Sequence, residues 1–163
     1  MKKALFVCLG NICRSPAAEG IFKKFVNDKK LDSIISVDSA GTIAYHQGEL
    51  PDKRMRKIAF KKGYTLNSRA RKFDPDTDFE NFDYIVTMDN NNYEDLMQLD
   101  KEELYKNKIL KMADFIDDKE VAEVPDPYYG GDKEFEYVIG LLENGSKNLL
   151  NKIKTDIERR DKK

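Results

Sequence analysis

The segment Cys8-Leu9-Gly10-Asn11-Ile12-Cys13-Arg14-Ser15-Pro16 constrains the fold more than any other part of this chain. It follows the short apolar run 4–7, which is typical of a buried strand, and it precedes residues 17–22, which are typical of the start of a helix. A thiol, a glycine-containing loop, an arginine and a helix N-terminus therefore meet at one strand-to-helix turn. The free N–H groups of a first helical turn and the helix dipole both favour a bound anion.

This turn suits a phosphate oxyanion in particular. Consecutive loop amides can form an anion-binding nest, and the planar guanidinium of Arg14 can hold two phosphate oxygens at once. The same positive field should stabilise Cys8 as a thiolate. A lone cysteine at a strand end is usually just buried, but here the turn combines a nucleophile with an oxyanion cradle.

The rest of the chain alternates between strand-like and helix-like patterns. We expect strands over residues 3–8, 33–39, 83–88 and 108–112. We expect helices after Ser15, from Pro51 to Gly63, from Asp89 to about Leu99, and over about 135–157, where Gly140 and Gly145 should weaken the helix. This order predicts an α/β fold, a single doubly wound domain with a four-stranded parallel sheet and helices on both faces. The domain should span residues 1–158, with 159–163 as a charged, solvated tail.

Composition excludes several classes of protein. The 29 basic and 30 acidic residues create no net field for nucleic acid, and no apolar run is long enough for a membrane span or a signal peptide. Both cysteines lie in the loop, which is no disulfide framework and agrees with a reducing compartment. With one histidine and no cysteine pair at ligand spacing, we predict no metal and no other cofactor. The expectation is a cytoplasmic monomer.

Several polar residues should converge at one edge of the sheet. In an open parallel sheet, ligands bind beyond the C-terminal ends of the strands, where Cys8, Ser39 and Asp89 are expected. Cleavage of a phosphate monoester also needs an acid for the leaving oxygen. Asp126 and His46 are the two candidates. From the residues alone Asp126-Pro127 is more typical of a turn, so the acid stays open.

The segment Cys8 to Pro16 resembles the signature loop of the low-molecular-weight protein tyrosine phosphatases. Residues 39–42 (Ser-Ala-Gly-Thr) and 126–130 (Asp-Pro-Tyr-Tyr-Gly) match further family segments in the same order, so the resemblance covers essentially the whole chain. It implies a cysteine-dependent phosphatase that hydrolyses phosphotyrosine in protein substrates. Cys8 would attack phosphorus, Arg14 and the loop amides would hold the oxygens, and Asp126 would protonate the leaving group and then activate water. His46 would be a loop or surface histidine.

The resemblance also implies roles for residues that support the loop. Ser15 is a candidate N-cap of the helix, and its family counterpart donates a hydrogen bond to the nucleophilic sulfur. Asn11 would shape the loop through Ser39. Ser68 stands where the family often has a histidine in the same network. Gly10 and Asn11 both tolerate the left-handed backbone angles that a tight loop needs.

By resemblance, a deep slot lies above a phosphate or sulfate ion held by the loop. Its phosphate-binding floor and apolar walls would comprise Leu9, Gly10, Asn11, Ile12, Cys13, Tyr45, Tyr128 and Tyr129. Phosphoarginine phosphatases of the family tend to carry threonine where this chain has Ile12, which favours phosphotyrosine here. The family resemblance further implies reversible inactivation by peroxide through a Cys8–Cys13 disulfide.

Two other functions compete with this interpretation. Thiol-dependent arsenate reductases share the fold and the loop, but they pass a disulfide to further cysteines outside the loop, and this chain has none. A non-enzymatic module that binds phosphorylated partners would need no acid, so the combination of Cys8, Arg14, Ser15 and Asp126 argues against it.

Overall fold

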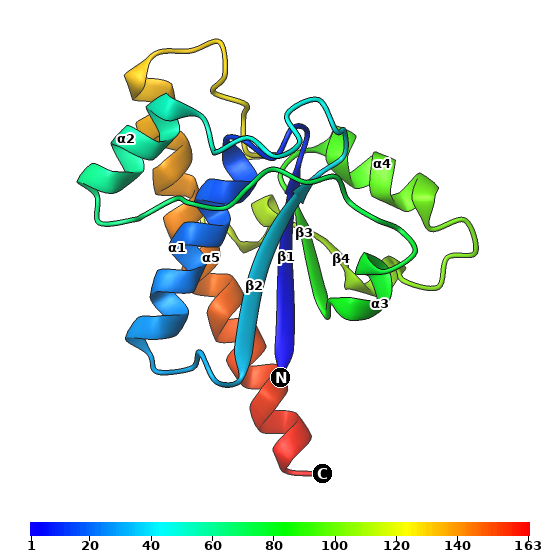
Figure 1. The fold of residues 1–163 in the computed structure, drawn as a ribbon. Coiled ribbons are helices and arrows are strands. Elements are labelled where there is room, and N and C mark those ends of the chain that lie inside the picture. The colour runs from blue at the N-terminus through cyan, green and yellow to red at the C-terminus, as the bar shows by residue number, and fades with distance from the viewer.

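The computed structural model describes all 163 residues and contains one four-stranded sheet. All neighbouring strands are parallel, and their order across the sheet is β2-β1-β3-β4 (Figure 1). The strands are β1 (Lys2–Cys8), β2 (Ile35–Gly41), β3 (Tyr84–Thr87) and β4 (Ile109–Lys111). The predicted α/β fold with a four-stranded parallel sheet is therefore confirmed.

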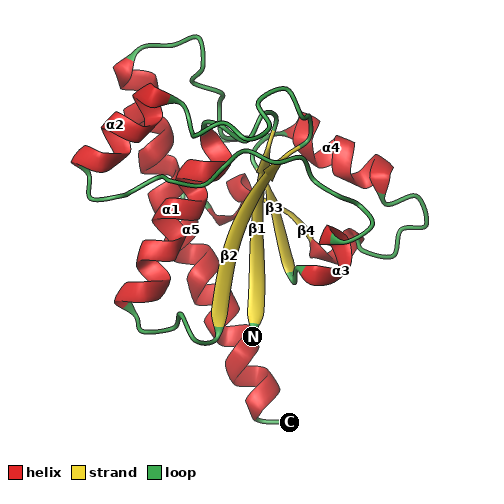
Figure 2. Cartoon of the chain, viewed as in Figure 1, coloured by secondary structure: helices red, strands yellow, loops and turns green.

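Helices cover both faces of the sheet, as predicted (Figure 2). One face carries α1 (Arg14–Asp28), α2 (Lys53–Lys61) and α5 (Asp132–Asp161). The other carries α3 (Asp78–Asn81) and α4 (Asn90–Leu99), and the short 3-10 turns η1 (Lys106–Lys108) and η2 (Met112–Phe115) flank β4. None of these helices combines the length and the apolar character needed to cross a membrane.

Two hydrophobic cores form because successive side chains of a strand point to opposite faces. Ala4 and Phe6 of β1 belong to the larger core, which packs against α1, α2 and α5. Leu5 and Val7 belong to the smaller core on the other face. There they meet three phenylalanines from α3 and the segments beside it, Phe73, Phe79 and Phe82.

Helix α5 contains two glycines in its interior. It runs without interruption for 30 residues, and the local weakening expected at Gly140 and Gly145 stays a prediction. A Cβ on Gly145 would lie 2.5 Å from Met112 Sδ, which shows that this glycine permits close packing of η2 against the helix. The helix also continues through Arg159 and Arg160, whose side chains are exposed, into the segment expected as a tail.

The ends of β1 and β2 bring the signature loop against its neighbour. The N–H of Thr42 donates to the Cys8 carbonyl at 3.0 Å, and the N–H of Ile43 donates to the Leu9 carbonyl at 3.1 Å. A Cβ on Gly41 would lie 2.7 Å from the Leu9 carbonyl oxygen, so a side chain there would displace the loop. Strand β2 runs two residues further than predicted, which places Ser39 within it.

Candidate active site

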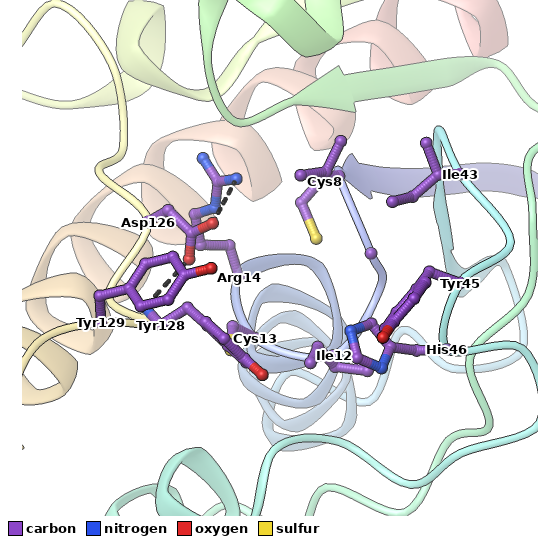
Figure 3. A pocket seen from close by; sticks show the side chains of 12 residues that line it. Cys8, Ile12, Cys13, Arg14, Ile43, Tyr45, His46, Asp126, Tyr128 and Tyr129 are labelled. Atoms are coloured by element: carbon purple, nitrogen blue, oxygen red, sulfur yellow. Dashed lines mark hydrogen bonds and ion pairs between the residues drawn. The ribbon is translucent and has the colours of Figure 1, made fainter.

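A cavity of about 330 Å³ opens beyond the C-terminal end of β1 (Figure 3). Three loops that are distant in sequence form it, and they meet as the sheet topology predicted. The cavity is lined by Cys8, Leu9, Gly10, Ile12, Cys13, Arg14, Ile43, Tyr45, His46, Asp126, Tyr128 and Tyr129. The structure therefore brings together the expected nucleophile, arginine, acid and aromatic walls.

Asn11 turns the loop and is not among the residues that line the cavity, so its expected part in substrate binding stays a prediction. Its φ of 59° is left-handed, as predicted, and its side chain is buried behind the loop. Gly10 does not have a positive φ, so that part of the prediction is wrong. Gly10 is instead constrained by space, because a Cβ there would lie 3.0 Å from Cδ2 of His46.

The Asn11 amide orients the hydroxyl of Ser15 toward the nucleophile. Its Oδ1 accepts the Arg71 N–H at 3.0 Å, which fixes Nδ2 as the donor to Ser15 Oγ at 2.8 Å. The Ser15 hydroxyl hydrogen then has two acceptors in reach, Cys8 Sγ at 3.0 Å and the Ala40 carbonyl at 3.4 Å. Ser15 is not the N-cap that we predicted. The helix begins at Arg14 after Cys13, and no side chain caps it.

The network behind the loop ends at a buried carboxyl group. Asn11 Nδ2 also donates to Ser39 Oγ at 2.9 Å, and Ser39 Oγ donates to Glu19 Oε1 at 2.6 Å. Burial raises the pKa of Glu19, and the Ser39 hydrogen bond partly opposes this shift. Ser68 makes no hydrogen bond to Asn11, so its predicted supporting role is wrong. Glu19 and the Arg71 backbone complete the network instead.

Arg14 is held by hydrogen bonds from its Nη1, which leaves other N–H groups of the guanidinium for a ligand. Nη1 donates to Asp89 Oδ2 at 2.6 Å and to the Val124 carbonyl at 3.0 Å. Burial alone would lower the pKa of Arg14, but the charges of Cys8 and Asp89 and the Asp89 hydrogen bond raise it. Its buried Nε has no partner, and Nη2 lies 3.6 Å from Asp126. Nε and Nη2 are thus placed to hold two oxygens of one oxyanion.

The two acid candidates differ in their surroundings. Asp126 lines the cavity with 43% of its side chain exposed, and its Oδ1 accepts the Tyr128 N–H at 3.1 Å. His46 lies in a loop, as expected, and it also lines the cavity. Its Nδ1 is engaged with Glu49 Oε2 at 2.6 Å, and its ring packs against Gly10. Geometry therefore favours Asp126 as the acid, because it lies 3.6 Å from Arg14 in the cavity that Cys8 also lines.

Helix α2 connects the loop of Cys8 with the loop of Asp126. The N–H of Asp52, its N-cap residue, donates to the Ile12 carbonyl at 2.6 Å. Arg54 Nη2 donates to the Tyr128 carbonyl at 2.8 Å and also pairs with Asp52 at 3.0 Å. Its guanidinium lies 5.5 Å from the centre of the Tyr128 ring. This pairing fixes the acid loop relative to the nucleophile loop.

The remaining cysteine and the aromatic walls complete the site. Cys13 is buried, and burial followed by the negative charge of Asp52 raises its pKa well above the usual range. The rings of Tyr128 and Tyr129 meet edge to face at 4.9 Å. Tyr45 stands across the opening, packed edge to face on His46 at 4.8 Å (Figure 3).

Sequence reasoning missed several residues that shape this site. They are Glu19, Ile43, Arg54 and Val124, together with the second role of Asp89. The sequence placed Asp89 at the start of a helix, and it caps α4 through Asn92 N–H at 2.8 Å. Its position at the end of β3, the strand beside β1, predicted it at the same sheet edge as Cys8, but its contact with Arg14 was not predicted.

Comparisons with known proteins agree with this geometry. The family "Low molecular weight phosphotyrosine protein phosphatase" matches residues 3–159. A low molecular weight phosphotyrosine protein phosphatase of Gallus gallus is 41% identical over 138 residues, which is 85% of this chain and 87% of that protein.

Two solved structures extend the comparison. A protein tyrosine phosphatase from Entamoeba histolytica, with Hepes in its active site, is 49% identical, has a TM-score of 0.92, and covers 96% of this chain and 99% of its own. A Drosophila arginine phosphatase is 32% identical with a TM-score of 0.87, covering 94% of this chain and 98% of its own. The chain belongs to the low-molecular-weight phosphotyrosine protein phosphatase family.

Proposed function

We propose that this protein hydrolyses phosphotyrosine in protein substrates through a cysteinyl-phosphate intermediate. The observation that carries the proposal is that the buried Nε of Arg14 has no partner, while Arg14 lines the same cavity as Cys8. A buried guanidinium N–H is stable without a protein partner when a ligand satisfies it. The nucleophile beside it makes a phosphoryl group the fitting ligand.

In the first step the Cys8 thiolate attacks phosphorus. The new S–P bond forms as the bond between phosphorus and the tyrosine oxygen breaks, and Asp126 gives its proton to that leaving oxygen. Arg14 Nε and Nη2, with the loop amides, neutralise the equatorial oxygens during transfer. Asp126 acts as the general acid in this step.

In the second step water attacks the phosphorus of cysteinyl-phosphate. Asp126, now ionised, accepts a proton from that water, and the S–P bond breaks to release phosphate and the Cys8 thiolate. The hydroxyl of Ser15, oriented by Asn11, donates to the departing sulfur at the 3.0 Å distance described above. This hydrogen bond stabilises the leaving thiolate.

The walls of the cavity support an aryl substrate. Leu9, Ile12, Tyr128 and Tyr129 offer apolar and aromatic surface to a phenol ring, and aromatic pairs of suitable geometry add about 0.5–1.5 kcal/mol beyond area burial. A shorter phosphoserine side chain would not bring its phosphorus to Cys8 at the cavity floor. We therefore expect phosphotyrosine to be hydrolysed far faster than phosphoserine.

The alternatives have less support. An arsenate reductase of this fold would need cysteines beyond Cys8 and Cys13, and the chain contains no others. A pure phosphate-binding module would not need a carboxyl group 3.6 Å from the oxyanion-binding arginine. A binding module would leave Asp126 without a purpose.

Substitution of the nucleophile tests the proposal. Cys8→Ser should lower kcat on phosphotyrosine peptides by roughly 10³-fold or more, because a serine hydroxyl is a far weaker nucleophile here than a thiolate. Phosphate binding, measured by titration calorimetry, should stay within a few-fold of the parent. Rapid quenching of the parent should trap phosphate on Cys8. Residual turnover within tenfold of the parent would rule out the covalent mechanism.

A further inference from the structure

Helix α2 and its C-cap concentrate positive charge. Residues 53–62, Lys-Arg-Met-Arg-Lys-Ile-Ala-Phe-Lys-Lys, contain six of the chain's 29 basic residues and none of its 30 acidic ones. The rest of the chain holds 23 basic against 30 acidic residues, although the net charge of the whole is −1. Helix α2 with its C-cap is therefore a strongly positive segment of a chain whose remainder is net negative.

Three of these lysines form a row. Lys53, Lys57 and Lys61 recur every four residues, so they lie one above another along the helix surface, and all three are exposed. Among the six basic residues, only Arg54 forms a salt bridge, with Asp52. Like charges at this spacing destabilise a helix, whereas a solvated surface helix commonly mixes both signs. The row thus does not serve the stability of α2.

The row borders a groove. A hollow of about 510 Å³ is lined by eight residues, four of them basic and none acidic, including Lys53, Lys57 and Lys61. Tyr64 and Leu66 form part of its floor. The groove therefore offers an anionic chain both charge and a shallow apolar surface.

The start of this row lies at the rim of the catalytic cavity. Asp52 and Arg54, on either side of Lys53, contact the Ile12 carbonyl and the Tyr128 carbonyl respectively. Figure 1 shows α2 next to the loop that leads into α5. This loop carries Asp126, the proposed acid. A peptide that leaves the cavity over α2 would meet the lysines in succession.

We propose that the row Lys53, Lys57 and Lys61 binds acidic residues that flank the phosphotyrosine of a protein substrate. This proposal rests on the proposed function and narrows its substrate class. Eight residues of helix span about 12 Å, and an extended peptide covers that length with about four residues. The preferred carboxylates therefore lie within about four positions of the phosphotyrosine.

An anionic membrane is the competing partner for a basic helix. A helix that binds membranes inserts an apolar face into the lipid boundary. The apolar residues of α2, Met55, Ile58 and Ala59, are buried in the core, and Phe60 is the one large apolar side chain exposed on this helix. With no apolar face to insert, α2 is better suited to an acidic peptide.

Charge reversal tests the row. The double variant Lys57→Glu/Lys61→Glu is compared with Lys101→Glu/Lys106→Glu, which changes the net charge equally at two exposed lysines between α4 and β4. The substrates are p-nitrophenyl phosphate, a phosphotyrosine peptide with neutral flanks and a phosphotyrosine peptide with three flanking glutamates.

The parent should favour the acidic peptide over the neutral one by about fivefold to tenfold in kcat/KM, which corresponds to the sum of a few exposed ion pairs. This preference should vanish in the α2 variant, persist in the control, and weaken with added salt.

The other outcomes are equally informative. Equal kcat/KM for both peptides in the parent, or equal losses in both variants, overturns the docking row while the phosphatase activity stands. Loss of anionic-vesicle binding in the α2 variant with unchanged peptide selectivity also overturns it, in favour of a membrane. If no phosphate ester is hydrolysed, the proposed function fails, and fluorescence anisotropy of both peptides on Cys8→Ser then decides the docking row separately.

Discussion

The guanidinium of Arg14 rests on the carboxylate of Asp89, with Nη1 2.6 Å from Oδ2. The arginine side chain is almost completely buried, and Asp89 also caps α4. One carboxylate therefore ties the oxyanion-binding residue of α1 to the helix that follows the neighbouring strand. Because Nη1 is occupied, Nε and Nη2 are the groups of this guanidinium left for a ligand.

Removing this carboxylate should weaken both activity and stability. Asp89→Ala leaves Arg14 buried without its charge partner, which typically lowers the free energy of unfolding by about 3–5 kcal/mol. The guanidinium should also lose its orientation, so we expect kcat/KM to fall about tenfold to a hundredfold. Asp89→Asn keeps the cap and a neutral acceptor, so urea unfolding should show a smaller loss. Unchanged kcat/KM in Asp89→Ala would mean that Asp89 acts only as a cap.

The proposed role of Asp126 as the general acid can be tested with substrates whose leaving groups differ in basicity. Asp126→Ala should slow phenyl phosphate far more than p-nitrophenyl phosphate, because only the more basic leaving oxygen needs a proton early. We expect a loss of about 10²-fold to 10⁴-fold for the poor leaving group. His46→Gln is the matched control on the other side of the cavity. An equal loss across the series in Asp126→Ala would place the acid elsewhere.

The fold was predictable because its signals are local. Apolar runs and helical periodicity mark each strand and helix within a few residues, and the parallel arrangement follows from their alternation. The distances at which helices pack against one another were not predictable. The sequence did not reveal that Gly145 accommodates Met112, because this contact depends on how closely η2 packs.

The site was predictable where one short segment supplies it. Cys8 and Arg14 belong to a single turn, whereas Asp89 and Arg54 act through side-chain contacts with residues more than 70 positions away. The N-cap prediction for Ser15 failed for a related reason. Its hydroxyl hydrogen bonds with Cys8 and Asn11, across the loop, instead of capping the helix backbone.

Oxidation should be reversible and dependent on pH. Peroxide converts the Cys8 thiolate to a sulfenic acid with release of hydroxide, and the Cys13 thiolate then attacks that sulfur to form a disulfide and release a second hydroxide. Burial raises the pKa of Cys13, so its thiolate is scarce at neutral pH and increases about tenfold per pH unit below that pKa. Disulfide formation after a peroxide pulse should therefore accelerate between pH 7 and 9.

Mass spectrometry of quenched samples measures this reaction. The parent should give a linked Cys8–Cys13 peptide and regain activity with thiol. Cys13→Ser should instead proceed to irreversible sulfinic acid at Cys8. Sulfinic acid without a linked pair in the parent, at every pH, would contradict the prediction.

The side chain of Ile12 should set the preference for phosphotyrosine over phosphoarginine. Ile12 is 9% exposed and lines the cavity, so it offers an apolar wall to the leaving group. A phenol gains from that wall, whereas a guanidinium loses hydration there without a replacement hydrogen bond.

Ile12→Thr supplies a hydroxyl at similar size and should narrow the ratio of kcat/KM for phosphotyrosine to kcat/KM for phosphoarginine by about tenfold. Ile12→Val keeps an apolar, β-branched wall and should leave the ratio nearly unchanged, which separates polarity from shape. If the parent hydrolyses phosphoarginine peptides faster than phosphotyrosine peptides, the wall does not set the preference, while the roles of Cys8, Arg14 and Asp126 would still be testable by the leaving-group series.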